Sequence, residues 1–245
     1  MKRILEVCAG SVQSVIAARD GGASRIELCS ALEIGGITPS VGLIAEARKV
    51  EDIALNVLIR PRGGDFLYNE SEVDTMVQDI TVARKLGADG VVIGALTADG
   101  DIDMAVCRRL IESAGNMRIT FHRAFDMCCD AYKALEDVIS LGCHRILTSG
   151  QATTAQSGSA LIKQLVERAE GRISIMPGCG VNATNAAEIL NKSGATEIHA
   201  SARSVVKSGM HYRHHDVNMG NSNMEEYDHM ESDVTLIKNI VNAIQ

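Results

Sequence analysis

A chain of 245 residues with 46% apolar and 22% charged side chains is long enough to bury a sizeable core. A formal net charge of −7 and an aromatic content of 3% argue against a nucleic-acid partner, because they leave no basic stripe and few stacking rings. No apolar run reaches about 20 residues and Glu6 interrupts the N-terminal segment, so neither a membrane span nor a signal peptide is predicted. Seven cysteines without the spacing of a secreted scaffold indicate free thiols, and we expect a cytoplasmic protein.

Short β-rich runs alternate with segments of helical periodicity along the whole chain. We predict eight strands, at residues 3–8, 25–29, 54–60, 90–94, 118–122, 145–148, 172–176 and 197–200. Apolar residues at helical spacing lie between them, and a last helix is predicted over residues 234–244. Every second strand is preceded by a glycine that can end a helix, at Gly22, Gly87, Gly142 and Gly194.

Eight strand–helix units in a chain of this length predict an α/β fold, a single-domain (β/α)8 or TIM barrel over residues 1–245. The alternative is an open, doubly wound sheet, but the turn after the first strand, Cys8-Ala9-Gly10-Ser11, is not the glycine-rich fingerprint of such sheets. Residues 202–232 are polar and lack clear periodicity, so we expect a long extended loop between the eighth strand and the last helix.

The site of a (β/α)8 barrel lies at the C-terminal ends of its strands, and alternation decides which side chains face inward. The same Glu-x-Cys triplet ends the first two strands, which turns Glu6, Cys8, Glu27 and Cys29 inward. The same phase turns inward Asn56, Arg60, Thr120, His122, Glu197 and His199. Ionised groups inside a barrel need partners, so we expect Glu6, Glu27 and Arg60 to pair with one another. A charge network that merely fills the barrel is the alternative.

Several long sequence blocks resemble the CutC family of copper homeostasis proteins. They are EVC (6–8), RIELC (25–29), GGITPS (35–40), IRPRGGDF (59–66), TFHRAFD (120–126), LTSG (147–150) and EIHAS (197–201). The resemblance covers nearly the whole chain. It implies a cytoplasmic barrel that forms homodimers or larger homo-oligomers and binds Cu(I) through the thiols of Cys8 and Cys29. Cys179 departs from the family pattern, which has glycine at this position.

Two thiolates from neighbouring strands suit a soft ion such as Cu(I). Strands about 4.8 Å apart can bring two inward sulfurs at equal height within bonding reach of one ion. A nearby imidazole would instead complete a Zn²⁺ site, and two buried, unreactive thiols are a further alternative. The loop at 202–232 adds side chains that can ligate copper, although a surface loop or an oligomer contact is favoured there. These side chains are Met210, His211, His214, His215, Met219, Met224, His229 and Met230.

A second interpretation is an enzyme that acts on a phosphorylated or carboxylated small molecule. Arginine grips such anions, and the loops after strands six to eight offer backbone N–H groups where barrels often bind phosphate. The candidate anion-binding residues are Arg62, Arg123, Ser149, Gly178, Gly180 and Ser201. The candidate catalytic residues are Glu6, Glu27, Arg60 and His122, with His122 as general acid or base beside a carboxylate. A non-catalytic scaffold is disfavoured because so many polar groups converge at the mouth.

Overall fold

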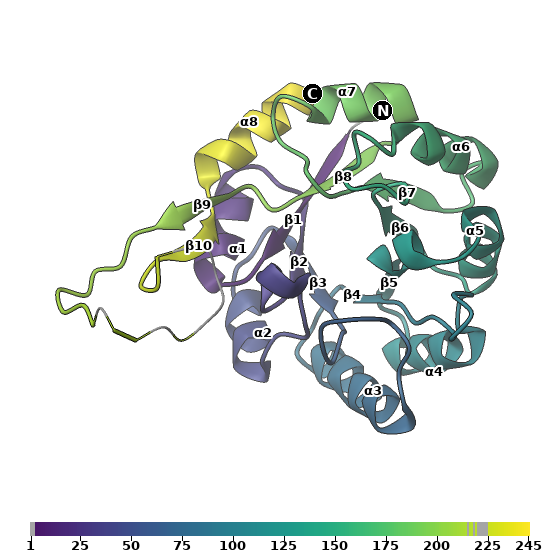
Figure 1. Cartoon of the computed structure of the whole chain (residues 1–245), viewed down its shortest axis with the longest axis horizontal. Helices are drawn as coiled ribbons and strands as arrows, with labels where there is room; N and C mark the ends of the chain where they lie inside the picture. The colour runs from purple at the N-terminus through teal and green to yellow at the C-terminus, as the bar shows by residue number, and fades with distance from the viewer. Residues whose placement is uncertain (1–2, 215, 218, 220–224) are drawn as a thin grey trace.

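The computed structural model of the protein describes residues 3–214, 216–217, 219 and 225–245. In this part of the chain, eight parallel strands lie in the order β7-β6-β5-β4-β3-β2-β1-β8. Because β7 also contacts β8, the sheet is a nearly closed barrel. Figure 1 looks along the barrel and shows the helices arranged around its outside. The predicted (β/α)8 barrel is thus confirmed.

Each predicted strand overlaps an observed one, with ends that differ by no more than two residues. The strands are β1 Ile4–Ala9, β2 Arg25–Leu28, β3 Ala54–Leu58, β4 Gly90–Ile93, β5 Arg118–Phe121, β6 Arg145–Thr148, β7 Ser174–Pro177 and β8 Glu197–Ala200. The helices are α1 Val12–Asp20, α2 Val41–Arg48, α3 Glu70–Lys85, α4 Met104–Ala114, α5 Ala131–Ser140, α6 Ser159–Ala169, α7 Ala186–Ser193 and α8 Val234–Ile244. None of these described helices is both long and apolar enough to span a bilayer.

Local sequence signals set the ends of the helices. Short polar residues cap the starts, as where the Ser11 hydroxyl accepts the Ser14 N–H and Asn69 begins a capping box at α3. The glycines that precede every second strand take left-handed backbone angles, with φ of 87° at Gly22 and 77° at Gly194. A side chain would be strained there, so glycine ends the helix and turns the chain into the next strand.

Alternation along the strands separates two buried regions. The outward residues, such as Val7 and Ile26, belong to the large apolar core between the barrel and its helices. Inside the barrel, Cys8 and Cys29 pack with Leu58 and Val92 in a small separate cluster. Most of the other inward side chains are polar, as the strand phase predicts, although Met176 contacts Arg25 inside the barrel.

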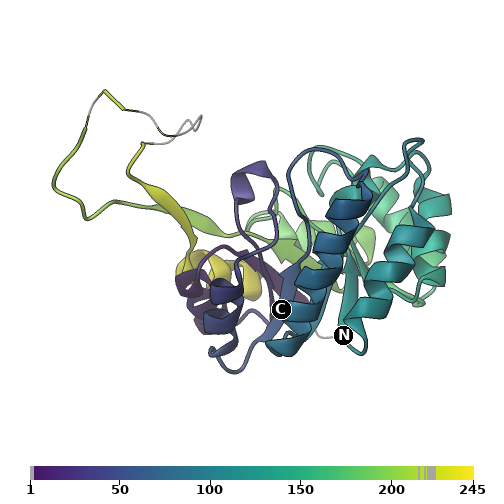
Figure 2. The same ribbon diagram turned by 90° about the horizontal axis from the view of Figure 1, so that it is seen from below.

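The segment predicted as one extended loop is in part a β-ribbon. Its two ends form the antiparallel strands β9 Arg203–Val206 and β10 His229–Ser232, which correct that prediction. Strand β10 packs on α1, and Figure 2 shows the described part of the segment extending away from the barrel. Strand β10, with the sequence His-Met-Glu-Ser, contains a single apolar residue, so no apolar run marks it in the polar sequence around it.

Candidate functional site

A buried ion-pair network occupies the barrel interior below the mouth. The Glu6 carboxylate has no exposed surface and pairs with the Arg25 guanidinium, which also donates to Glu197 at 2.5 Å. Arg145 donates to the same Glu197 oxygen at 3.1 Å. The expected pairing of Glu6 with Arg60 is therefore wrong, because the register of β1 and β2 places Glu6 beside Arg25.

The two arginines of this network have a sequence signal that strand phase alone did not reveal. Arg25 and Arg145 each follow a strand-entry glycine by three residues, and Glu197 does the same after Gly194. In the remaining strand entry this position is Gly90, where a Cβ atom would collide with the Asn56 side chain. The equivalent positions of the repeated pattern thus supply the interior layer of the barrel.

His199 links this network to the mouth. Its Nδ1 lies 2.9 Å from a Glu6 oxygen, and its Nε2 lies 3.7 Å from a Glu27 oxygen. Burial opposes a charge on the ring, but hydrogen bonds with Cys8 and Glu6 raise the pKa of His199 well above its usual range. Burial also disfavours the charged form of Glu27, and in a carboxyl group this raises the pKa, to about 8. His199 was placed inward by strand phase but was not among the candidate site residues.

Cys8 and Cys29 are in contact, although not at equal height. Cys8 pairs in register with Glu27, so Cys29 lies two residues farther along its strand. The Cys29 thiol donates to the Ala9 carbonyl at 3.7 Å. Its proximity nevertheless holds the pKa of Cys8 well below its usual value, against the effect of burial, and His199 adds to this. The proximity of Cys8 and burial raise the pKa of Cys29. Cys8 is therefore the more acidic of the two thiols.

A cavity of about 300 Å³ opens above these groups at the mouth of the barrel. Its polar and charged walls come from strand ends on all sides. They include Cys8, Glu27, Arg60, His122, Arg123, Cys179, His199, Ser201 and Arg203, while Leu32, Leu58, Phe66, Leu147 and Val181 supply apolar surface. Three guanidinium groups at one cavity make its surroundings strongly cationic.

The predicted catalytic residues Arg60 and His122 line this cavity but do not contact the carboxylates. Arg60 is 6% exposed, donates to the backbone carbonyls of Ile34, Gly36 and Gly64, and lies over the Phe66 ring. Glu6 and Glu27 are not its partners, because loop backbone surrounds its guanidinium group.

His122 is 4% exposed, and its Nδ1 accepts the Ala124 N–H at 3.1 Å. Its Nε2 has no hydrogen-bond partner among the described residues. Burial, and secondarily the charge of Arg60, lowers the pKa of His122 to about 3, so the ring is neutral near pH 7. A neutral ring that accepts at Nδ1 carries its proton on Nε2, where it can donate to a ligand.

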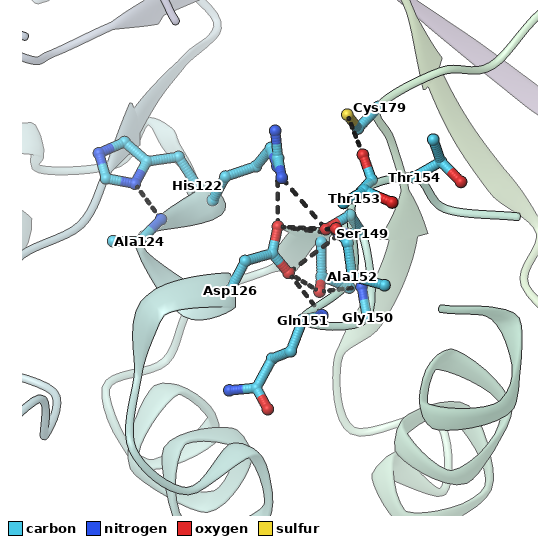
Figure 3. Close-up of polar contacts among 12 residues, drawn as sticks. His122, Ala124, Asp126, Ser149, Gly150, Gln151, Ala152, Thr153, Thr154 and Cys179 are labelled. Carbon is cyan, nitrogen blue, oxygen red and sulfur yellow. Dashed lines mark hydrogen bonds and ion pairs between the residues drawn. The ribbon is translucent and has the colours of Figure 1, made fainter. Parts of the chain in front are cut away.

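Arg123 is held at the rim of the cavity by a buried carboxylate. Asp126 accepts from the hydroxyls of Thr148 and Ser149 and from the backbone N–H groups of Ser149 and Gln151, as Figure 3 shows for the residues labelled there. The Arg123 Nε donates to the same carboxylate at 2.7 Å, and its terminal nitrogen donates to the Ser149 hydroxyl at 3.1 Å. Ser149 is fully buried, so it positions Arg123 and does not itself line the cavity.

Two further candidates for the anion site lie outside the cavity. Arg62 pairs with Glu72 at 2.5 Å and with Asp65 at 3.0 Å, on the outer side of the loop after β3, which corrects its assignment. Gly178 is not part of the cavity lining, and a Cβ there would lie 2.5 Å from a Leu147 methyl group. Gly180 and Ser201, by contrast, line the cavity, and their role in binding an anion stays a prediction.

Cys179 brings another thiol to the cavity wall. Its φ of 84° is a left-handed conformation that disfavours any side chain, and its thiol donates to the Thr153 carbonyl at 3.2 Å (Figure 3). Glycine would adopt this conformation without strain, and the cysteine is accommodated with strain.

The methionine- and histidine-rich segment contributes no metal centre in the part of the chain that the structure describes. His215 and Met224 lie outside the described residues, whereas Met210, His211 and Met219 are exposed. No group of three or more His, Cys, Asp or Glu side chains among the described residues has an arrangement that could hold a metal ion.

The chain is a (β/α)8-barrel protein with a cationic, cysteine-containing mouth. It belongs to the CutC family, whose model matches residues 3–204. A CutC family protein from Bacteroides fragilis is 52% identical over 244 residues, covering 99% of this chain and 96% of the relative. The human copper homeostasis protein cutC homolog is 49% identical over 242 residues, covering 98% and 88%. The crystal structure of a CutC protein from Streptococcus agalactiae superposes with a TM-score of 0.78 at 36% identity, covering 81% of this chain and 98% of that one.

Proposed function

We propose that this protein binds one Cu(I) ion per chain through Cys8 and Cys29, and that it serves copper homeostasis in the cytoplasm as a homo-oligomer. The observation that carries the proposal is the packing of Cys8 and Cys29 together in one small buried cluster inside the barrel. Cu(I) favours soft thiolate ligands and accepts two of them. The human relative's name, copper homeostasis protein cutC homolog, agrees with this role.

The surroundings of the two thiols favour Cu(I) over Zn²⁺. Zinc in proteins takes four ligands in a tetrahedron. The nearest imidazole, His199, is engaged with Glu6 at 2.9 Å and does not complete a three-ligand group with the cysteines. The lowered pKa of Cys8 makes it the thiol that loses its proton more readily, and binding of the metal would displace the proton of Cys29.

A titration of the full chain with Cu(I) under reducing conditions, against a chromogenic Cu(I) chelator, tests this function. We expect one equivalent to bind the unmodified protein and none to bind the Cys8→Ser, Cys29→Ser variant. Cys129→Ser is the matched control, because that thiol is exposed and lies away from the cavity. Unchanged stoichiometry and affinity in the double variant would place the ligands elsewhere and refute the proposal.

A second function is favoured by the cavity itself, which at about 300 Å³ is far larger than a two-coordinate ion needs. We propose that the cavity accepts an anionic small molecule and that the chain acts on it as an enzyme. Glu27 and His199 lie 3.7 Å apart at the cavity wall, as a proton donor and acceptor serving a bound molecule would.

Turnover of a panel of phosphorylated and carboxylated metabolites, followed by NMR, tests the second function. We expect Glu27→Gln to abolish turnover while the thiols remain intact. Glu33→Gln, on the exposed part of the loop after β2, is the matched control. If no member of the panel is converted by the unmodified chain, the enzymatic function is refuted. Conversion by Glu27→Gln at the same rate would refute the role of Glu27.

A further inference from the structure

We propose that the cavity binds a small phosphate monoester, with its phosphoryl group held by Arg203 and by backbone N–H groups after β7 and β8. This names the substrate class of the second function proposed above and rests on it, but binding can be measured without turnover. The site differs from the anion site predicted from sequence, since Arg203 takes the place expected for Arg62.

Arg203 is a cation without a carboxylate partner among the described residues. It begins β9, is half-buried and lines the cavity. No carboxylate of the described chain lies within ion-pair distance, and its buried Nε has no hydrogen-bond partner there. Withdrawing a guanidinium group from water without a partner costs free energy, which a bound anion would recover.

Arg60 supplies a second uncompensated charge at the same cavity. Its terminal nitrogens are satisfied by carbonyl oxygens, which are neutral, and its own buried Nε lacks a partner. Arg123, in contrast, is already neutralised by Asp126. Two of the three cavity arginines therefore have no carboxylate partner among the described residues, which matches the two charges of a phosphate monoester better than the single charge of a carboxylate.

Backbone donors complete the site on the side of β7 and β8. The N–H groups of Gly180, Val181, Ser201 and Ala202 have no acceptor among the described residues. Gly180, Val181 and Ser201 line the cavity. Free N–H groups in the loops after strands seven and eight are the usual phosphate cradle of (β/α)8 barrels. Three terminal phosphoryl oxygens can use these donors together with the guanidinium fork.

The rest of the cavity determines what carries the phosphate. Cys8, Glu27 and His199 lie at one wall, and Leu32, Leu58 and Phe66 supply apolar contact. A short organic body attached to the phosphoryl group would extend from Arg203 toward Glu27 and His199. The inferred occupant is thus a small phosphate ester rather than a free inorganic ion or a long phosphorylated chain.

Isothermal titration of the full, metal-free chain with glycerol 3-phosphate, inorganic phosphate and glycerate tests this inference. We expect glycerol 3-phosphate to bind more tightly than the other two. Arg203→Met should weaken it about tenfold or more, because a charge-assisted contact is lost. Arg203→Lys keeps the charge and should retain part of the affinity. Arg62→Met is the matched control outside the cavity, and this variant should bind glycerol 3-phosphate with unchanged affinity.

The outcomes distinguish the phosphate site from Cu(I) binding and from the enzymatic function. Absence of binding to the unmodified chain, equal affinity in Arg203→Met, or tighter binding of glycerate would overturn the phosphate site. Binding of glycerol 3-phosphate together with no turnover of any member of the metabolite panel would refute the enzymatic function and leave the site in place. Retained binding in the Cys8→Ser, Cys29→Ser variant is expected, because neither thiol is part of the phosphoryl cradle.

Discussion

Replacing Arg25 by methionine should destabilise the barrel by about 3 kcal/mol at pH 7. The guanidinium contacts Glu6, which has no exposed surface, so its removal leaves a carboxylate without its main counter-charge. Loss of one partner of a buried pair costs about 3–5 kcal/mol. The lower end applies, because Glu197 keeps Arg145 at 3.1 Å and Glu6 keeps His199 at 2.9 Å.

The pKa of Glu6 gives an independent measure of the same interaction. Burial alone would raise it, but the charge of Arg25 and the hydrogen bond with His199 lower it from 4.5 to about 2. A shift of this size corresponds to about 3 kcal/mol of stability, at about 1.4 kcal/mol per unit. This stabilisation is complete above pH 4.5 and disappears as the pH falls toward 2. The difference between the unmodified protein and Arg25→Met should therefore shrink in acid.

Urea unfolding followed by circular dichroism, at pH 7 and at pH 3.5, measures both effects. Arg19→Met is the matched control, since Arg19 pairs with Asp20 on the surface, where ion pairs contribute at most about 1 kcal/mol. Arg25→Met as stable as this control would show that the buried pair adds nothing net. A loss of stability that is equal at both pH values would refute the electrostatic explanation.

Three further substitutions probe the mouth. The pKa of His122 is about 3 in the folded protein and 6.5 in the unfolded chain, so protonation below pH 6.5 favours unfolding. The free energy of unfolding should fall by about 2 kcal/mol between pH 6.5 and 5. Urea titrations of His122→Gln should not show this loss. Gly178→Ala should lower the free energy of unfolding, measured by thermal unfolding, by about 1–3 kcal/mol, because its Cβ would meet Leu147 at 2.5 Å. Gly209→Ala adds a Cβ in open space and should leave the free energy of unfolding nearly unchanged. Cys179→Gly should raise the free energy of unfolding by about 1 kcal/mol by relieving a φ of 84°, and an unchanged value would contradict the assigned strain.

Local periodicity was sufficient to predict the barrel and the direction of its inward side chains. The eight β-rich runs and the strand-entry glycines are signals within a few residues, and each corresponds to an observed strand or turn. Alternation correctly placed Glu6, Glu27, Arg60, His122 and His199 in the interior or at the cavity. Period-two geometry requires only the strand itself, so no knowledge of neighbouring strands was needed.

Pairing among those inward groups depended on the register between strands, which no single segment encodes. Glu6 meets Arg25 because β1 and β2 align at those residues. The same alignment pairs the backbone of Cys8 with that of Glu27, two residues before Cys29. Loop direction was equally inaccessible: Arg62 follows Pro61 out of the barrel toward Glu72, while Arg203 turns to the cavity. The sequence by itself thus determined which side chains face inward, and tertiary structure decided which of them meet, because hydrogen-bond register and loop course are set by the closed barrel as a whole.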